Sequence, residues 1–280
     1  MEYQATSRGI ELHDCPDFDL RETFLCGQCF RWEEEPGGSF RGIVRARALR
    51  VYRDEDVLVL EGASVEDYLS LWRDYFDLGL DYGALRRAFS GMGPVLREAA
   101  RYAPGMRILR QEPWGALCSF ILSQNNNIPR IRGIVDRLCA CFGRPVEGGF
   151  AFPSAERLAL LSPDELAPVR CGFRAKYVID AAKKVASGEV DLEQARLLPL
   201  PQARESLMRI VGVGPKVADC ALLYGLHRLE AFPMDVWMRR AMDTLFPGRT
   251  PADFGPYAGI AQQYIFHYSR MHPELFQKEA

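Results

Sequence analysis

The stretch SLMRIVGVGPKVADCALLYGLHRLEAFPMDVWMRRAMDTLF, residues 206–246, decides the fold of this chain. A helical pattern ends at Val211, and the glycine-rich turn Gly212–Gly214 follows it. Two glycines around one apolar residue permit a tight reversal that other residues resist. Pro215 suits the first turn of a new helix, where its missing N–H is not needed. We therefore predict two helices joined by a tight turn over about 206–226.

The predicted turn exposes backbone N–H groups at the start of the second helix, where they can hold a phosphate without contacting a base. Gly212 and Gly214 are therefore candidate phosphate-binding residues. Two other phosphate-binding loops do not fit. The spacing of the nucleotide-binding P-loop is absent, and a dinucleotide fingerprint would need a preceding strand and different glycine spacing.

Lys216 and Asp235 are the candidate catalytic residues of this stretch. A cation at a helix N-terminus opposes the helix dipole, so Lys216 is expected to favour the neutral amine that a nucleophilic lysine needs. Asp235 is expected to cap the next helix, and its carboxylate could stabilise positive charge near Lys216. Spacing alone leaves two alternatives open, a solvated lysine and an aspartate that only caps.

The rest of the chain predicts an α+β fold. Residues 19–60 resemble an antiparallel meander, with turns at Pro36–Gly38 and Asp54–Asp56. After Val65 the pattern is helical to the end, and no strand is expected. Helical patterns cover about 84–102, 112–123, 126–142, 163–169, 174–187, 202–211, 216–226, 235–245 and 256–271. The predicted domains are 1–105, the sheet with flanking helices, and 106–280, the helical region.

Five further segments narrow the interpretation. They are GQCFRW (27–32), SQNNNIPRIRGIVDRLC (123–139), GFRAKYV (172–178), VGPKVADC (213–220) and GPYAGIAQQYIF (255–266). Together with the hairpin, the lysine and the later aspartate, they resemble the 8-oxoguanine DNA glycosylase family of the helix-hairpin-helix superfamily. The resemblance spans nearly the whole chain. It implies a bifunctional glycosylase and abasic-site lyase that excises 8-oxoguanine, preferentially opposite cytosine, from double-stranded DNA.

The resemblance also assigns roles by position. Lys216 attacks the sugar C1′ and Asp235 supports the positive charge. Gly27, Cys220, Gln262 and Phe266 bind the flipped base; Asn125, Arg130 and Arg174 contact the orphaned cytosine, and Phe173 is the wedge. Trp237 departs from the family, several members of which have a phosphate-binding histidine there; an indole N–H can still donate one hydrogen bond.

Cofactor predictions follow from the same resemblance. No cysteine of the printed sequence follows Cys220, so we expect no iron–sulfur cluster and no required cofactor. No side-chain metal site is expected. Hairpins of this kind hold K⁺ or Na⁺ through backbone carbonyls, here those of Met208, Ile210 and Val213.

Charge and cysteine content limit the alternatives. The formal charge is -2, which excludes a histone-like binder, whereas residues 120–184 carry ten basic and six acidic side chains. Cys26 and Cys29 form a CxxC, and Cys139 and Cys141 lie in a helical pattern; we interpret all four as structural thiols. A glycosylase for another damaged purine and a non-catalytic DNA-binding module stay as alternatives. A cytoplasmic monomer, nucleoid-associated if bacterial, without membrane contact is expected.

Overall fold

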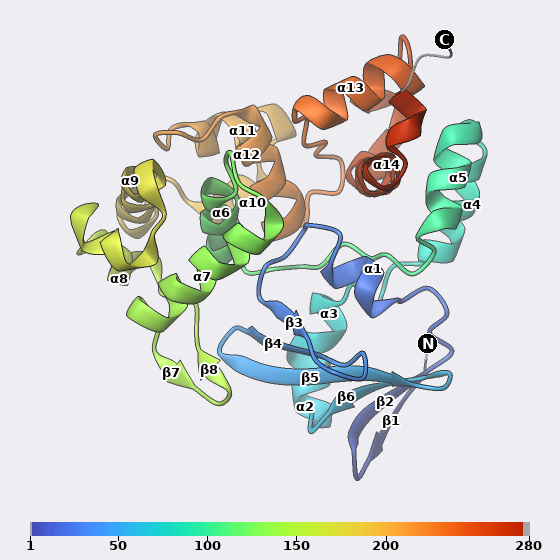
Figure 1. The fold of residues 1–280 in the computed structure, drawn as a ribbon, viewed down its shortest axis with the longest axis horizontal. Helices are drawn as coiled ribbons and strands as arrows, with labels where there is room; N and C mark the ends of the chain where they lie inside the picture. The colour runs from blue at the N-terminus through green and yellow to red at the C-terminus, as the bar shows by residue number, and fades with distance from the viewer. Residues whose placement is uncertain (1, 277–280) are drawn as a thin grey trace.

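The computed structural model describes residues 2–276 and consists of a small antiparallel sheet below a larger helical region (Figure 1). The main sheet has the order β1-β2-β6-β5-β4-β3, and a separate two-stranded hairpin pairs β7 with β8. The strands are β1 (Glu2–Thr6), β2 (Gly9–His13), β3 (Trp32–Glu34), β4 (Phe40–Val44), β5 (Arg47–Asp54), β6 (Val57–Glu61), β7 (Pro145–Val146) and β8 (Gly149–Phe150).

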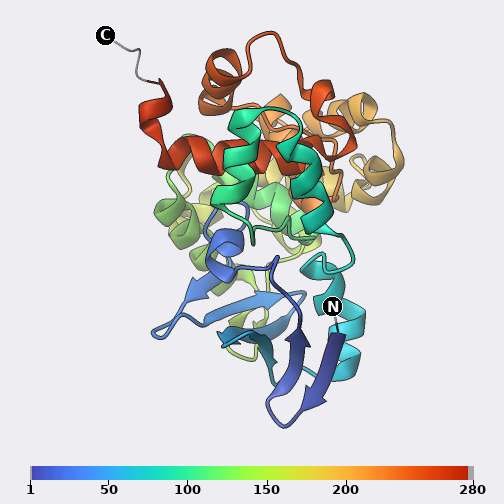
Figure 2. The same cartoon turned by 90° about the vertical axis from the view of Figure 1, so that its right-hand side faces the viewer.

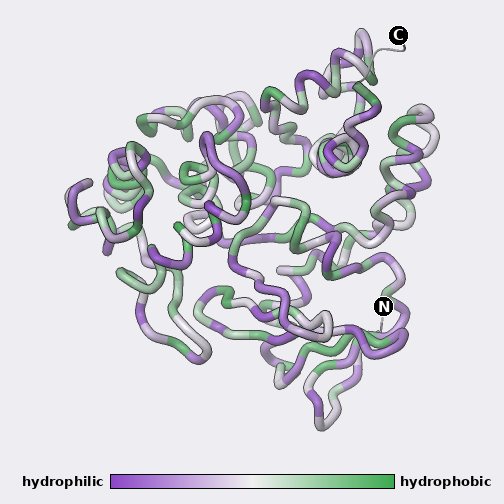
Figure 3. Tube along the Cα trace, in the orientation of Figure 1, coloured by the Kyte–Doolittle hydropathy of each residue, from purple (hydrophilic) through white to green (hydrophobic). Residues whose placement is uncertain are grey.

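Hydrophobic and hydrophilic residues interleave along most of the chain (Figure 3), whereas helix α6 is buried from Ala116 to Leu122. The helices are α1 (Leu20–Phe24), α2 (Val65–Asp67), α3 (Arg73–Tyr75), α4 (Tyr82–Ser90), α5 (Pro94–Tyr102), α6 (Pro113–Leu122), α7 (Ile128–Phe142), α8 (Ala155–Ala159), α9 (Ala175–Ala186), α10 (Leu192–Leu197), α11 (Leu200–Met208), α12 (Pro215–Cys220), α13 (Val236–Leu245) and α14 (Ala258–Met271). Two π-helical segments, η1 (Tyr68–Trp72) and η4 (Ala221–Gly225), continue α2 and α12. The 3₁₀ segments are η2 (Asp164–Val169), η3 (Gly172–Arg174), η5 (Pro251–Tyr257) and η6 (Pro273–Phe276).

The meander differs from its prediction at two places. The first part of the predicted strand region, after Asp19, is helix α1, because the Asp19 side chain accepts the Glu22 N–H and caps a helical turn. The predicted continuous strand through residues 39–52 is a hairpin, β4 and β5, that turns at Arg45 and Ala46. Both turn residues have positive φ, 46° and 65°. Such turns usually contain Asn, Asp or Gly, and none of these three occurs at residues 45 and 46.

Two strand pairs were not predicted at all. Strands β1 and β2 form one edge of the main sheet, with β1 almost fully exposed and β2 almost fully buried, so neither shows the alternation of a half-buried strand. The hairpin β7–β8 has strands of two residues each, too short to leave a pattern, and it corrects the prediction of no strand after Val65.

Two hydrophobic cores lie beneath these elements. One packs the main sheet against residues from α1, η1 and α3, and the other fills the helical region. Helices α4 and α5 belong to the helical core and lie beside α14 (Figures 1 and 2). The predicted helix over 84–102 is broken between them at Gly91–Gly93. A domain boundary at 105/106 stays a prediction.

The segment 105–111 joins the two regions. The Gly105 carbonyl accepts the Asp19 N–H at 2.8 Å, and the Leu109 N–H donates to Gln28 Oε1 at 2.9 Å. These bonds hold the start of α1 and the loop after it against the segment 105–111. Among the residues that the structure describes, no helix is long and apolar enough to cross a membrane.

Candidate active site

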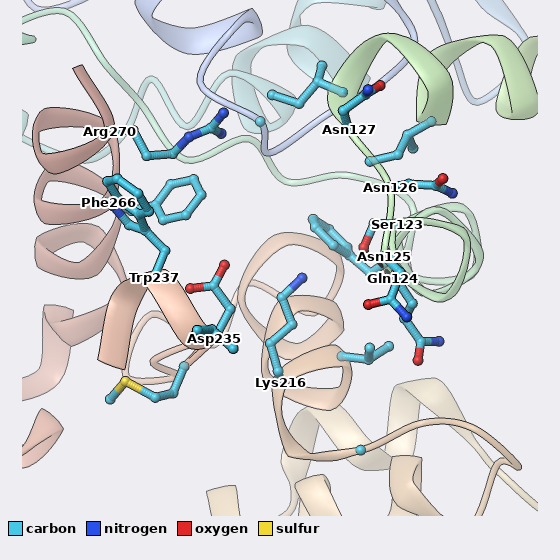
Figure 4. Close-up of a pocket in the computed structure, with 18 of the residues that line it drawn as sticks. Ser123, Gln124, Asn125, Asn126, Asn127, Lys216, Asp235, Trp237, Phe266 and Arg270 are labelled. Carbon is cyan, nitrogen blue, oxygen red and sulfur yellow. Dashed lines mark hydrogen bonds between the residues drawn. The ribbon is translucent and has the colours of Figure 1, made fainter. Parts of the chain in front are cut away.

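A pocket of about 700 Å³ lies at the junction of the two regions. Its walls come from the loop at Gly27, the turn 123–127, the start of α12, residues 234–237 and the C-terminal half of α14. Figure 4 shows Lys216, Asp235 and Phe266 entering this space from three different elements. The volume falls within the range of ~300–1,000 Å³ that is usual for small-molecule pockets.

The hairpin predicted from sequence is present, with α11 and α12 joined by residues 209–214. Gly212 has φ +81°, and a Cβ there would lie 2.5 Å from the Tyr177 ring, so only glycine fits. Val213 is buried, and Pro215 occupies the first turn of α12 as predicted. The result is a turn whose backbone approaches the surface beside Lys216.

Lys216 is half-buried and its side chain extends into the pocket (Figure 4). Its Nζ lies 5.5 Å from the centroid of the Phe120 ring, which forms part of the floor. This position differs from that of an ordinary surface lysine, and the catalytic role of Lys216 stays a prediction. The prediction that the amine is neutral is not decided by the geometry and stays a prediction.

Asp235 caps α13 as predicted, with Oδ1 accepting the Met238 N–H at 2.7 Å. Its carboxylate also faces the pocket, on the wall across from Lys216 (Figure 4). The capping alternative is therefore correct but incomplete, because the same side chain meets the cavity that the lysine enters.

The residues predicted to bind the base separate into two groups. Gly27 and Phe266 line the pocket directly. Cys220 and Gln262 are buried and are not among the residues that line it. Burial raises the pKa of the Cys220 thiol to about 11, so the sulfur is neutral at ordinary pH. Gln262 Oε1 is buried without a hydrogen-bond partner within residues 2–276.

The residues assigned to the orphaned base surround the turn after α6. Asn125 is exposed with φ +50° and lines the pocket, and Arg130 is exposed in the first turn of α7. Phe173 is 50% exposed, which excludes a position in the core. Its ring centroid lies 4.3 Å from the Arg174 guanidinium carbon.

Arg174 is buried rather than extended into solvent. Its guanidinium donates to the carbonyls of Gln124, Asn125 and Cys171, which fixes the turn that carries Asn125. Burial, together with the charge of Arg130, lowers the pKa of Arg174. The two arginines therefore lie close together at this edge.

Trp237 lines the pocket, but its indole N–H donates to Ser269 Oγ at 2.9 Å. A phosphate contact through this N–H would have to replace the bond to Ser269. The structure also adds two cations that the sequence patterns did not indicate, Arg239 and Arg270. The Arg270 guanidinium lies 5.3 Å from the centroid of the Phe266 ring, one helical turn earlier. In the sequence, only the four-residue spacing from Phe266 indicates that Arg270 lies near the pocket.

The cysteines are mostly structural, with one correction. Cys26 and Cys29 are buried free thiols, and burial raises the pKa of Cys26 to about 11. Cys139 is buried in α7, but Cys141 is exposed, so its interpretation as a core thiol was wrong; it lies on the outer face of the helix. Within the described chain, no group of three or more His, Cys, Asp or Glu side chains could hold a metal ion.

Family models match both parts of the chain. Residues 13–117 match the 8-oxoguanine DNA glycosylase N-terminal domain, and residues 118–253 match the HhH-GPD superfamily of base-excision DNA repair proteins. The N-glycosylase/DNA lyase OGG1 of Arabidopsis thaliana is 32% identical over 89% of this chain and 77% of its own length. The N-glycosylase/DNA lyase of Saccharomyces cerevisiae is also 32% identical, over 79% of this chain and 66% of its own.

Solved structures agree with the family models. The 8-oxoguanine glycosylase/lyase of Clostridium acetobutylicum, in a complex with DNA carrying cytosine opposite 8-oxoguanine, has a TM-score of 0.92 and is 32% identical over 98% of this chain and 99% of its own. A 3-methyladenine DNA glycosylase from Archaeoglobus fulgidus, at 20% identity and a TM-score of 0.71, shares the fold alone.

The helix-hairpin-helix turn, the lysine after it and the pocket beside it define a DNA glycosylase of the base-excision repair class. Within that class, the chain belongs to the 8-oxoguanine DNA glycosylase family.

Proposed function

We propose that this protein excises 8-oxoguanine from duplex DNA, preferentially opposite cytosine, and then cleaves the strand at the abasic site. The observation that carries the proposal is the pairing of Lys216 and Asp235 in one pocket of about 700 Å³, a space that can admit a purine. A target base inside a duplex must be flipped out to reach such a pocket.

The chemistry begins at Lys216. Its neutral amine attacks C1′ of the flipped nucleotide as the bond from C1′ to the base breaks, and the base leaves with the bonding electrons and takes up a proton. Asp235 stabilises the positive charge that develops on the sugar. Opening of the sugar ring gives a Schiff base, loss of a C2′ proton eliminates the 3′ phosphate, and water then releases Lys216.

Selection of the base rests on its edges and faces. Phe266, which lines the pocket, stacks on one face, and the other face packs against the buried Cys220 once the pocket opens to that side chain. Gln262 meets the Watson–Crick edge, and its buried, unpartnered Oε1 is an acceptor available for that purpose. The Gly27 carbonyl accepts the N7 proton that 8-oxoguanine carries and guanine lacks, a contact worth about 1–3 kcal/mol.

The orphaned cytosine meets the edge formed by Asn125, Arg130 and Arg174, while the exposed Phe173 ring wedges into the vacated stack. The Clostridium relative in complex with a cytosine-containing duplex supports this preference. Gly212 and Gly214 offer backbone N–H groups to a phosphate, with Trp237 nearby. A K⁺ or Na⁺ at the carbonyls of Met208, Ile210 and Val213 would stiffen this turn.

Borohydride trapping tests the proposal. Reduction converts the Schiff base to a stable covalent adduct, so the wild-type protein should become attached to a duplex that carries 8-oxoguanine opposite cytosine. Lys216→Gln should form no adduct and cleave no strand, while its affinity for the lesion duplex persists. An adduct that still forms with Lys216→Gln would mean that a different amine performs the attack.

The same duplexes with each of the four bases opposite the lesion test the pairing preference. Excision should be fastest opposite cytosine, and Arg130→Ala should reduce that difference. Equal rates opposite all four bases would refute the roles given to Arg130 and Arg174 without affecting the role of Lys216.

A further inference from the structure

A closed ring of hydrogen bonds, buried or part-buried, includes the backbone at Gly27, which has φ +93° and forms part of the pocket wall. Both residues next to Gly27 are held through their carbonyls. Gln263 Nε2 donates to the Cys26 carbonyl at 3.1 Å, and Gln111 Nε2 donates to the Gln28 carbonyl at 2.7 Å. Gly27 therefore lies between two carbonyls that are each held by a hydrogen bond from a glutamine side chain.

The orientation of the Gln263 amide is set by its two partners. The Cys26 carbonyl can only accept, so the NH₂ group must face it. The amide oxygen then accepts from the Tyr224 hydroxyl, which burial keeps protonated by raising its pKa. Gln263 is 1% exposed, so water cannot replace either partner without opening the core.

Gln28 anchors the other side of the ring. Its side chain is fully buried and its Nε2 donates to the carbonyls of Thr23, at 2.9 Å, and Arg107, at 2.6 Å. The ring closes because the Gln111 N–H donates to the Tyr224 carbonyl at 3.0 Å. Tyr224 therefore contacts two glutamines of the ring: its hydroxyl donates to Gln263 and its carbonyl accepts from Gln111.

Tyr224 also connects the ring to the nucleophile. It lies in the π-helical segment η4, which continues α12 beyond Lys216 and Cys220. Its ring stacks on Phe120 with centroids 5.1 Å apart, and Phe120 in turn lies beneath the Lys216 amine. The loop at Gly27 and the helix of Lys216 are therefore positioned against one shared set of buried side chains.

We propose that Gln263, oriented by Tyr224, is a positioning residue that fixes the direction of the Gly27 carbonyl for recognition of the damaged base. This inference rests on the proposed function. A glycine at positive φ can adopt many backbone conformations, so its carbonyl points in one direction only if the neighbouring peptides are held. Recognition of a single N7 proton by one acceptor requires that direction.

The test uses Gln263→Met, which keeps the length of the side chain and removes both the donor to Cys26 and the acceptor for Tyr224. Two rates are measured under single-turnover conditions on duplexes with cytosine opposite: base excision at 8-oxoguanine and strand cleavage at a preformed abasic site. Excision should fall about tenfold, because the Cys26 carbonyl beside Gly27 loses its buried donor. Abasic-site cleavage should stay within about twofold, because it needs Lys216 but no base recognition.

Gln263→Glu supplies a second readout. A protonated glutamate donates to the Cys26 carbonyl as the amide does, whereas the ionised form repels it. Burial raises the pKa of a carboxyl group, so excision by this variant should recover relative to wild type as the pH falls. Tyr75→Phe is the matched control. It removes a buried hydrogen bond of 2.7 Å to Trp32 in the sheet core and should leave the ratio of the two rates unchanged.

The outcomes separate the two proposals. If the wild-type protein does not excise 8-oxoguanine, the proposed function fails. If wild type does and Gln263→Met lowers both rates equally, or neither, Gln263 is a structural residue only and this inference is overturned.

Discussion

The observed cap and the proposed catalytic role of Asp235 can be separated by substitution. Its Oδ1 caps α13 through the Met238 N–H, and its carboxylate faces the pocket that holds Lys216 (Figure 4). Asparagine caps helices about as well as aspartate but carries no charge. Stability and catalysis therefore respond differently to the same position.

We predict that Asp235→Asn slows excision roughly 100-fold, because the charge on the sugar loses its stabilising carboxylate. Its melting temperature should match that of wild type. Asp235→Ala should be as slow and in addition lose about 1 kcal/mol of stability with the cap. Single-turnover rates and thermal unfolding provide both measurements. A fast Asp235→Asn variant would reduce this residue to a cap.

At the scale of elements, two side chains of α9 hydrogen-bond to the backbone of the hairpin at residues 209 and 211. Asp180 Oδ2 accepts the Val211 N–H at 2.7 Å, and Lys184 Nζ donates to the Arg209 carbonyl at 2.6 Å. The two side chains also form an ion pair at 3.1 Å. Residues from one helix thus hold the chain that leads into the turn 212–214, which we propose binds a phosphate. Phe173 and Arg174 lie just before that helix.

We predict that Asp180→Ala weakens binding to a duplex with an abasic-site analogue by about fivefold, the effect of one lost hydrogen bond on the order of the turn. Asp180→Asn keeps an acceptor and should bind within about twofold of wild type. Fluorescence anisotropy titrations measure both. Unchanged affinity in Asp180→Ala would show that the turn holds its shape without α9.

The elements also show where sequence patterns fail. The hairpin 206–226 was predictable because its glycines, proline and flanking helical patterns are local signals. The turn at Arg45 and Ala46 was not, because it takes positive φ without a glycine or asparagine. Strand β1 is exposed, and in the sheet it pairs with β2 alone, a partner that its own pattern does not reveal.

At the scale of the whole molecule, Glu22 links the two regions. It follows Asp19 at the start of α1 and accepts the Gly105 N–H at 2.7 Å. Burial raises the pKa of Glu22 from an ordinary 4.5 to about 7, and the nearby charge of Asp19 adds to the increase. The folded protein therefore binds this proton more tightly than the unfolded chain does.

Because the pKa of Glu22 is higher in the folded protein, the free energy of unfolding should fall as the pH rises. The contribution of Glu22 to stability is fully present below about pH 4.5 and is lost as the pH rises to about 7. We predict that Glu22→Gln, which is neutral throughout, is more stable than wild type at pH 8 by roughly 1–3 kcal/mol, with little difference at pH 5. Denaturant unfolding at the two pH values measures this. An equal difference at both would contradict the assigned pKa.

Sequence alone determined the hairpin, the lysine after it, the capping aspartate and the α+β division, because each depends on neighbours a few residues away or on composition. Only the tertiary structure decided which side chains share the pocket, because Gly27, Lys216 and Phe266 come from distant parts of the chain. It also decided that Arg174 is buried, that the Trp237 N–H is engaged and that Gln263 supports the Gly27 loop. Hydrogen-bond partners across two packed regions leave no local pattern, so they appear only when the chain is folded.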